Sequence, residues 1–227
     1  FGHPTQKDIG FTGEREPRFF SDAVKEAGFQ DDILNKEAPI NKANAPKRKL
    51  SVRVNTLASA KAAVTNGADV IYVGGEAFRP NRPWSYSDYA DIINFAKGKA
   101  KVIINTPRTT MRRECGELEQ FFTAINNNSA LQADGIMVSN LGSLKLAKKL
   151  TKLPVYADTS FNLFNHLAAR FLKENGLVQG TASFELSFEQ LKEIVEASEL
   201  PIETVFHGSY ESMICDHNLP AMSLPAF

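Results

Sequence analysis

Two carboxylates and one imidazole follow consecutive apolar runs in the second half of the chain. They are Asp158, Glu185 and His207. If these runs are parallel strands, their carboxyl ends share one face, and this set of side chains suits a divalent metal that keeps open water positions. That interpretation predicts metal-assisted hydrolysis. The alternative is structural: Asp158 caps the loop that follows it, Glu185 pairs with an arginine, and His207 is satisfied by polar neighbours.

A nucleophilic mechanism is the second chemistry that these residues allow. Ser209 or Cys215 would attack the substrate, and His207 or His217 would act as the base. Nothing in the sequence resembles a Gly-x-Ser-x-Gly elbow or a papain-type cysteine motif. A lone cysteine in such a loop is more often an inert small apolar residue, which is the competing interpretation of Cys215.

Two further segments have the composition of ligand sites. Gly74 and Gly75 end an apolar run, and with Arg79 and Arg82 they could hold a carboxylate or phosphate, because glycines let backbone donors approach an anion. A loop with surface arginines is the alternative. The aromatic residues that follow could stack the bases of single-stranded RNA, or they could cover the top of a helix. They are Trp84, Tyr86 and Tyr89.

Short apolar runs alternate with segments of helical period along most of the chain, which is typical of a (β/α) barrel. The predicted strands are 50–55, 69–74, 101–105, 135–139, 154–158, 177–185 and 202–207. The predicted helices are 57–66, 88–97, 113–125, 141–150, 165–175 and 187–197, several of them opened by a capping Ser, Thr or Asn. No eighth strand is visible, so the fold class is α/β, an incomplete (β/α)8 TIM-type barrel. A flavodoxin-like open sheet competes, but it usually needs only about five strands.

The first 49 residues form a separate, irregular N-terminal extension and linker in this interpretation, and residues 50–227 form the barrel module. The extension contains scattered glycines and prolines, and one short helix is predicted from Ser21 to Gly28. Its last part, residues 41–49, is polar and basic, as in a solvated linker, although a nucleic-acid role is the alternative. The chain begins without Met and stops just after an apparent strand end, which suggests a fragment of a longer protein.

The amino-acid composition excludes some classes of protein but does not identify a binding partner. Lys plus Arg equals Asp plus Glu at 26 each, so no overall charge draws the chain to nucleic acid or to a membrane. The two cysteines are too few for a disulfide framework or for a four-cysteine metal or iron–sulfur site. The sequence has no signal peptide pattern and no apolar stretch of about 18 residues. We therefore expect a soluble cytoplasmic protein that does not enter a membrane, and its oligomeric state stays open.

Several segments resemble the peptidase U32 family, the collagenase-like proteases. Asn66-Gly-Ala-Asp-Val-Ile-Tyr-Val-Gly-Gly75, Leu153-Pro-Val-Tyr-Ala-Asp-Thr-Ser-Phe-Asn162 and Glu185-Leu-Ser-Phe-Glu-Gln-Leu191 are similar to family motifs in the same order and spacing. Glu203-Thr-Val-Phe-His-Gly-Ser209 is similar to the family signature Glu-x-Phe-x-x-Gly-Ser/Ala, with Val205 where Phe is usual. The resemblance covers roughly residues 50–222.

The departures from the family pattern concern an iron–sulfur cluster. In many members the signature continues into cysteines that hold such a cluster, and there the resemblance implies hydroxylation of RNA or quinone. This chain has Glu211 at the early cysteine position, Asn218 at the later one, and Cys215 out of register. A cluster held by this chain alone is therefore not expected. Either the cluster belongs to a region outside the chain, or the chain represents a cluster-free branch.

The resemblance implies peptide hydrolysis, with a peptide or denatured, collagen-like substrate. Glu203, His207, Glu185 and Asp158 are the expected catalytic residues. Polar residues at strand ends and in the signature are the expected substrate-binding residues, namely Arg79, Asn105, Arg108, Asn162, Gly208 and Ser209. The first alternative is an RNA-modifying or RNA-binding module whose iron–sulfur part lies outside this chain. The second is a scaffold without catalysis. The cofactor is left open, with a divalent metal at Asp158, Glu185 and His207 as the candidate.

Overall fold

The computed structural model describes residues 49–76, 82–112 and 114–209. The predicted N-terminal helix 21–28 lies outside the described residues. The same holds for Arg79, Glu211, Cys215, His217 and Asn218. The division into an extension of 1–49 and a module of 50–227 therefore stays a prediction.

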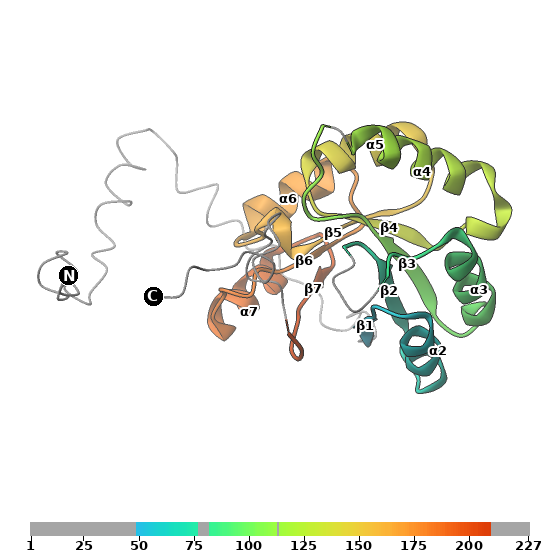
Figure 1. Ribbon diagram of the computed structural model, residues 1–227. Coiled ribbons are helices and arrows are strands. Elements are labelled where there is room, and N and C mark those ends of the chain that lie inside the picture. The colour runs from blue at the N-terminus through green and yellow to red at the C-terminus, as the bar shows by residue number, and fades with distance from the viewer. Residues whose placement is uncertain (1–48, 77–81, 113, 210–227) are drawn as a thin grey trace, which may run out of the picture. The chain divides into compact units, whose positions relative to one another are not determined.

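Seven parallel strands form a single curled sheet in sequence order, and the fold is an incomplete (β/α)8 barrel (Figure 1). The strands are β1 (Ser51–Arg53), β2 (Val70–Gly74), β3 (Lys101–Asn105), β4 (Gly135–Val138), β5 (Val155–Ala157), β6 (Gln179–Thr181) and β7 (Ile202–Glu203). Each strand pairs with the next, from Ser51 opposite Val70 to Thr181 opposite Glu203. Within the described ranges no ladder joins β7 back to β1, so the predicted absence of a closing strand holds there.

Helices connect the strands and lie along the outside of the sheet (Figure 1). They are α2 (Leu57–Thr65), α3 (Tyr86–Ala96), α4 (Cys115–Asn127), α5 (Leu141–Leu150), α6 (His166–Glu174) and α7 (Phe188–Ala197), with short 3-10 helices η3 (Ser129–Leu131) and η4 (Thr159–Phe161). Their starts follow the capping chemistry: Thr56 caps α2, Ser85 and Ser187 form capping boxes, and Asn140 and Asn165 cap α5 and α6. No helix in these described parts is both long and apolar enough to cross a membrane.

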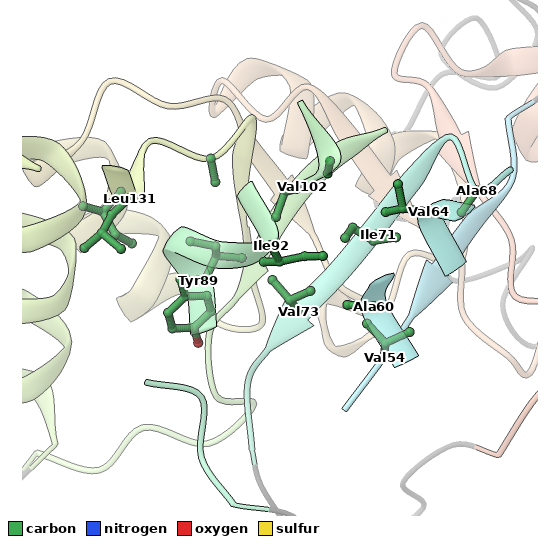
Figure 2. Packing of buried hydrophobic residues seen from close by; sticks show 14 residues of the cluster. Val54, Ala60, Val64, Ala68, Ile71, Val73, Tyr89, Ile92, Val102 and Leu131 are labelled. Atoms are coloured by element: carbon green, nitrogen blue, oxygen red, sulfur yellow. The ribbon is translucent and has the colours of Figure 1, made fainter. Parts of the chain in front are cut away.

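Side chains along each strand point alternately to the two faces of the sheet, so the buried residues form an outer core and an inner core. Residues of one parity, such as Ile71 and Val73 in β2, pack outward against α2 and α3 together with Ile92 (Figure 2). Residues of the other parity face the barrel interior, where Val70, Tyr72, Ile103 and Met137 form a smaller buried cluster with Tyr156 beside it. The outer core thus fixes the helices, while the inner one fills the barrel below its mouth.

The barrel interior also holds one carboxylate, that of Glu203 on β7. Its Oε2 accepts hydrogen bonds from the Tyr72 hydroxyl at 2.6 Å, the Ser51 hydroxyl at 2.8 Å and Gln179 Nε2 at 3.0 Å. These donors come from β2, β1 and β6, so the carboxylate joins the last strand to the first two without backbone pairing. Burial and then the neighbouring Glu203 charge raise the pKa of the Tyr72 phenol, which keeps it a proton donor.

Two predicted strands are longer than those observed. The run 177–185 contributes only Gln179–Thr181 to the sheet, and the run 202–207 contributes only Ile202–Glu203. After β6 the Ser183 N–H still donates to the Leu163 carbonyl at 3.1 Å, and the following residues, with Glu185, leave the sheet and line the mouth. The polar residues after β6 and β7 are therefore loop residues, and this decides which of them reach the site.

Candidate functional site

A cavity of about 320 Å³ lies at the carboxyl ends of the strands. Its walls come from the segments that follow β1, β3, β5, β6 and β7, as expected for a site in a (β/α) barrel. The lining is charged or polar at nearly every position. It consists of Arg53, Asn55, Arg108, Asp158, Thr159, Ser160, Asn162, Ser183, Phe184, Glu185, Val205 and Ser209.

Asp158 is the most firmly oriented carboxylate of this cavity. Its Oδ1 accepts hydrogen bonds from the backbone N–H and the hydroxyl of Thr159, which begins η4. Its Oδ2 accepts a 3.0 Å hydrogen bond from the hydroxyl of Ser139 at the end of β4. Oδ1 already accepts two hydrogen bonds, whereas Oδ2 keeps an unused acceptor direction, so Asp158 can cap η4 and also accept a hydrogen bond from a ligand N–H.

Arg108 reaches the cavity from the β3–α4 loop, which is anchored from both sides. The Arg108 backbone N–H donates to Oε1 of Glu76, which follows β2. The Arg108 carbonyl accepts a 3.3 Å hydrogen bond from Nδ2 of Asn140, which follows β4. Because the two anchors hold main-chain atoms, they set the position of the loop from which Arg108 joins the cavity lining.

The remaining predicted residues of the lining are Glu185, Asn162 and Ser209. The Glu185 backbone N–H donates to the Ser183 hydroxyl at 3.3 Å, which turns the loop after β6. Asn162 is the non-glycine residue with a left-handed backbone in the described ranges, at φ 50°, where it ends η4. Asn tolerates this conformation better than most residues, so its type at this position has a structural reason besides any role in binding.

Four predicted site residues do not line the cavity. Glu203 lies within β7, opposite Thr181, so its side chain points into the barrel below the mouth. His207 lies four residues beyond the end of β7 and is exposed. Asn105 is only 5% exposed within β3, and its Oδ1 is buried without a hydrogen-bond partner. Gly208 is exposed and has a positive φ of 124°.

The predicted anion site at Gly74 and Gly75 is arranged differently from the expectation. Arg82 forms a two-pronged ion pair with Asp88, at 2.7 and 2.9 Å, and so supports the cap of α3. The arginine beside Gly75 is instead Arg53, whose Nη2 would lie 3.7 Å from a Cβ added there. Arginine and glycine do meet at this strand end, but the arginine comes from β1.

The aromatic residues predicted to stack RNA bases pack on the protein itself. Trp84 stacks on Tyr89 with ring centroids 5.5 Å apart, and Tyr86 stacks on Phe121 of α4 at 6.1 Å. Tyr89 also contacts Phe121 and is buried. The helix-covering alternative therefore describes this cluster, which joins α3 to α4.

The geometry gathers neither a metal-ligand set nor a nucleophile–base pair. In residues 49–76, 82–112 and 114–209, no three His, Cys, Asp or Glu side chains are placed to hold a metal ion. Asp158 and Glu185 share the cavity, but His207 does not join them. No His or Cys is among the described residues of the lining, so Ser209 has no imidazole partner there.

The chain also does not fit an iron–sulfur cluster. Such clusters need four thiolate ligands, and the whole sequence contains two cysteines. Cys115 begins α4, where its thiol donates to the Met111 carbonyl at 3.5 Å, and it does not line the cavity. No reaction step on a cluster can therefore be derived from the residues of this chain.

Sequence reasoning missed several residues of the lining, and Arg53 is the most informative of them. It is the last residue of β1 and shares the inward parity of Ser51. The rule that barrel sites form at strand ends would have found it. Phe184 gave no such signal, because its place in the lining depends on where β6 ends.

Comparisons with known proteins agree with this architecture. The model of peptidase family U32 matches residues 55–216, more than half of the chain. The 23S rRNA 5-hydroxycytidine C2501 synthase of Escherichia coli K12 is 29% identical over 154 residues, which cover 67% of this chain and 23% of that protein. The tRNA hydroxylation protein P1 of Bacillus subtilis is 26% identical over 182 residues, covering 78% of this chain and 42% of that protein.

The chain thus spans less than half the length of these two relatives. Among solved structures, that of the U32 peptidase Mk0906 superposes with a TM-score of 0.55 at 16% identity, covering 71% of this chain and 70% of that one. At that identity the superposition shows only that the two chains share a fold. The family assignment rests on the match of the family model. The chain belongs to peptidase family U32.

Proposed function

We propose that this barrel is the substrate-binding module of an RNA-modifying protein and that its mouth cavity takes one nucleotide extruded from an RNA. The observation that carries the proposal is the lining of the cavity. Its described residues supply two arginines, two carboxylates, hydroxyls, amides and one aromatic ring, and none of them is His or Cys. This composition suits recognition by hydrogen bonds better than it suits hydrolysis.

The size of the cavity is consistent with a single small ligand. Its volume of about 320 Å³ is at the lower end of the range for ligand pockets. Enzymes that modify a base within RNA or DNA hold it outside the stack, where they bind its edge through hydrogen bonds and its face through stacking. Asp158 offers acceptors, Arg53 and Arg108 offer forked donors, and the Phe184 ring at the wall offers a stacking face.

The relatives named for hydroxylation of ribosomal and transfer RNA support this choice over peptide hydrolysis. Peptide hydrolysis, the first expectation from the sequence, requires an activated nucleophile, a metal-bound water or a water activated between two carboxylates. Among the described side chains of this mouth there is no His or Cys and no metal-ligand set, and the carboxylate of Asp158 accepts from Thr159 and Ser139 without a contact to Glu185. An iron–sulfur cluster needs four thiolate ligands, and this chain has two cysteines. We therefore assign RNA binding to this chain. Any cluster used in hydroxylation would be held by residues outside it.

Binding of a labelled RNA hairpin with a single-stranded loop tests the proposal. The 227-residue chain should bind the hairpin, and Arg108→Ala should weaken binding by about tenfold or more, which corresponds to about 1.4 kcal/mol for one charge-assisted hydrogen bond. Arg112→Ala is the matched control, because Arg112 lies in the same loop, is exposed and does not line the cavity. Equally weakened binding in both variants, or cleavage of denatured collagen by a chain that does not bind the hairpin, would contradict the proposal.

A further inference from the structure

Helix α5 carries a concentration of positive charge in a chain whose net charge is zero. Lys145, Lys148 and Lys149 lie in α5, and Lys152 follows two residues after its end. All four are exposed. No Asp or Glu occurs between Asp134 and Asp158, so the segment contributes four positive charges with no local compensation. Within the described part of the chain, no carboxylate lies at ion-pair distance from these lysines.

The fold presents these lysines to solvent in one direction. The opposite face of α5, formed by Ser143, Leu144 and Ala147, is buried against the sheet and its neighbours. Spacings of three and four residues place Lys145, Lys148 and Lys149 side by side on a helix. The positive charges therefore form a continuous strip on the outside of the barrel and are not scattered around it.

Helix α5 begins close to the mouth, and its lysines follow from the second turn to the end of the helix. Asn140 caps α5 by accepting from the Ser143 N–H at 2.8 Å, and its Nδ2 donates to the Arg108 carbonyl in the loop that lines the cavity. Helix α5 therefore begins at the rim of the cavity and runs away from it. A strand that leaves the cavity past Asn140 would meet Lys145 first, and Lys149 and Lys152 farther from the mouth.

Lys148 has a separate structural contact. Its Nζ donates to the carbonyl of Asn175 at 2.7 Å, where α6 ends. This bond joins α5 to α6 and satisfies a carbonyl at a helix terminus. Lys145, Lys149 and Lys152 have no such contact among the described residues, and they are the lysines whose positive charge is left to solvent.

We infer that Lys145, Lys149 and Lys152 form a lysine track that binds the phosphate backbone of the RNA whose nucleotide enters the mouth cavity. The inference rests on the proposed function and adds a second contact surface to it. Contacts with phosphates supply affinity that does not depend on sequence and that falls as salt displaces the RNA. The cavity would select the nucleotide, and the lysine track would hold the flanking strand.

The test compares two triple variants of the full chain in which the charge changes equally. K145Q/K149Q/K152Q removes the lysine track and keeps Lys148. K97Q/K101Q/K192Q removes three exposed lysines from other places, namely Lys97 directly after α3, Lys101 in β3 and Lys192 in α7. Binding of the labelled RNA hairpin is measured over a series of salt concentrations, and thermal midpoints verify that both variants are folded.

The track variant should bind more weakly at low salt, and the slope of log K against log salt should flatten by about 2, because each phosphate that is no longer neutralised changes it by about 0.7. The control variant should keep most of the wild-type slope. If wild-type chain binds the hairpin and the two variants behave alike, the track is wrong while the proposed function stands. If wild-type chain binds no RNA, both fail. Equally tight binding of poly-glutamate to the track would overturn its assignment to RNA.

Discussion

The Tyr72 hydroxyl on β2 donates a 2.6 Å hydrogen bond to the Glu203 carboxylate on β7, 131 residues away in the sequence. Together with Ser51 on β1, it ties the last described strand to the first two where no backbone ladder does so. The segment that resembles the family signature begins at Glu203, and the structure places this carboxylate inside the barrel. Its position below the mouth makes it a determinant of the shape of the cavity, whose walls follow β1 and β7.

Tyr72→Phe should destabilise the protein by roughly 2 kcal/mol, because it removes a hydroxyl that donates to a charged acceptor and leaves that carboxylate with less compensation. The measurement is the free energy of unfolding in urea. Tyr86→Phe is the control, since Tyr86 is 51% exposed and its ring contact with Phe121 does not involve the hydroxyl. Equal stability of the two variants would show that the Tyr72–Glu203 bond is not holding the strands.

The start of α3 provides a prediction about pH. Hydrogen bonds from Arg82 and then from Ser85 hold the pKa of the Asp88 carboxyl well below its usual range. The folded pKa is thus lower than the unfolded value of about 3.9, so the unfolded chain binds the proton more readily. The stabilisation from Asp88 is fully present above the unfolded pKa and is lost as pH falls towards the folded pKa.

Asp88→Ala should therefore lower the thermal midpoint at pH 7, by the equivalent of roughly 1 kcal/mol, and the difference from wild type should shrink below about pH 4. Most of the effect comes from the capping box, because the Arg82 guanidinium is largely exposed and solvent weakens its ion pair. Asp91→Ala, an exposed position of the same helix, should show no such dependence. A difference that is constant with pH would contradict the role of the ionised carboxylate.

Substitution by alanine should change the stability of the protein in opposite directions at Gly135 and Gly116. A Cβ at Gly135, which begins β4, would lie 2.5 Å from the Tyr156 ring and 2.9 Å from the Pro154 carbonyl. Gly135→Ala should therefore destabilise by about 1–3 kcal/mol through overpacking. Gly116 in α4 has no atom within 4 Å of such a Cβ, and Gly116→Ala should stabilise by about 0.5–1 kcal/mol. Urea unfolding of both variants checks the sign, and two changes of the same sign would be evidence against this packing.

The sequence predicted elements better than it predicted the site. Apolar runs and capping residues located all seven strands and the six described helices, because local periodicity and hydrogen bonding at helix ends are encoded by near neighbours. Glu203 and His207 lie outside the cavity lining, since their positions depend on where β7 leaves the sheet, and Glu203 accepts from donors on strands far apart in the sequence. Asp158 and Arg108 lie in the lining because they follow strands that end where their apolar runs end.

The anchored loop after β3 leads to the last prediction. Glu76 does not line the cavity, but its carboxylate accepts the backbone N–H of Arg108. Glu76→Ala should release the loop and weaken binding of the RNA hairpin by about tenfold, or 1.4 kcal/mol, although the variant removes no group that touches RNA. The measurement is hairpin affinity, with thermal midpoints to confirm folding. Glu117→Ala, an exposed carboxylate on α4, is the control with the same change of charge.

A double-mutant cycle separates loop positioning from a general electrostatic effect. If Glu76 acts by placing the Arg108 side chain, its removal should matter little once that side chain is absent, so Glu76→Ala/Arg108→Ala should bind the hairpin about as weakly as Arg108→Ala alone. Additive effects would mean that Glu76 influences RNA by another route. Tighter binding by Glu76→Ala would mean that its negative charge merely repels RNA, because removing a carboxylate near an anionic ligand strengthens attraction wherever the loop lies.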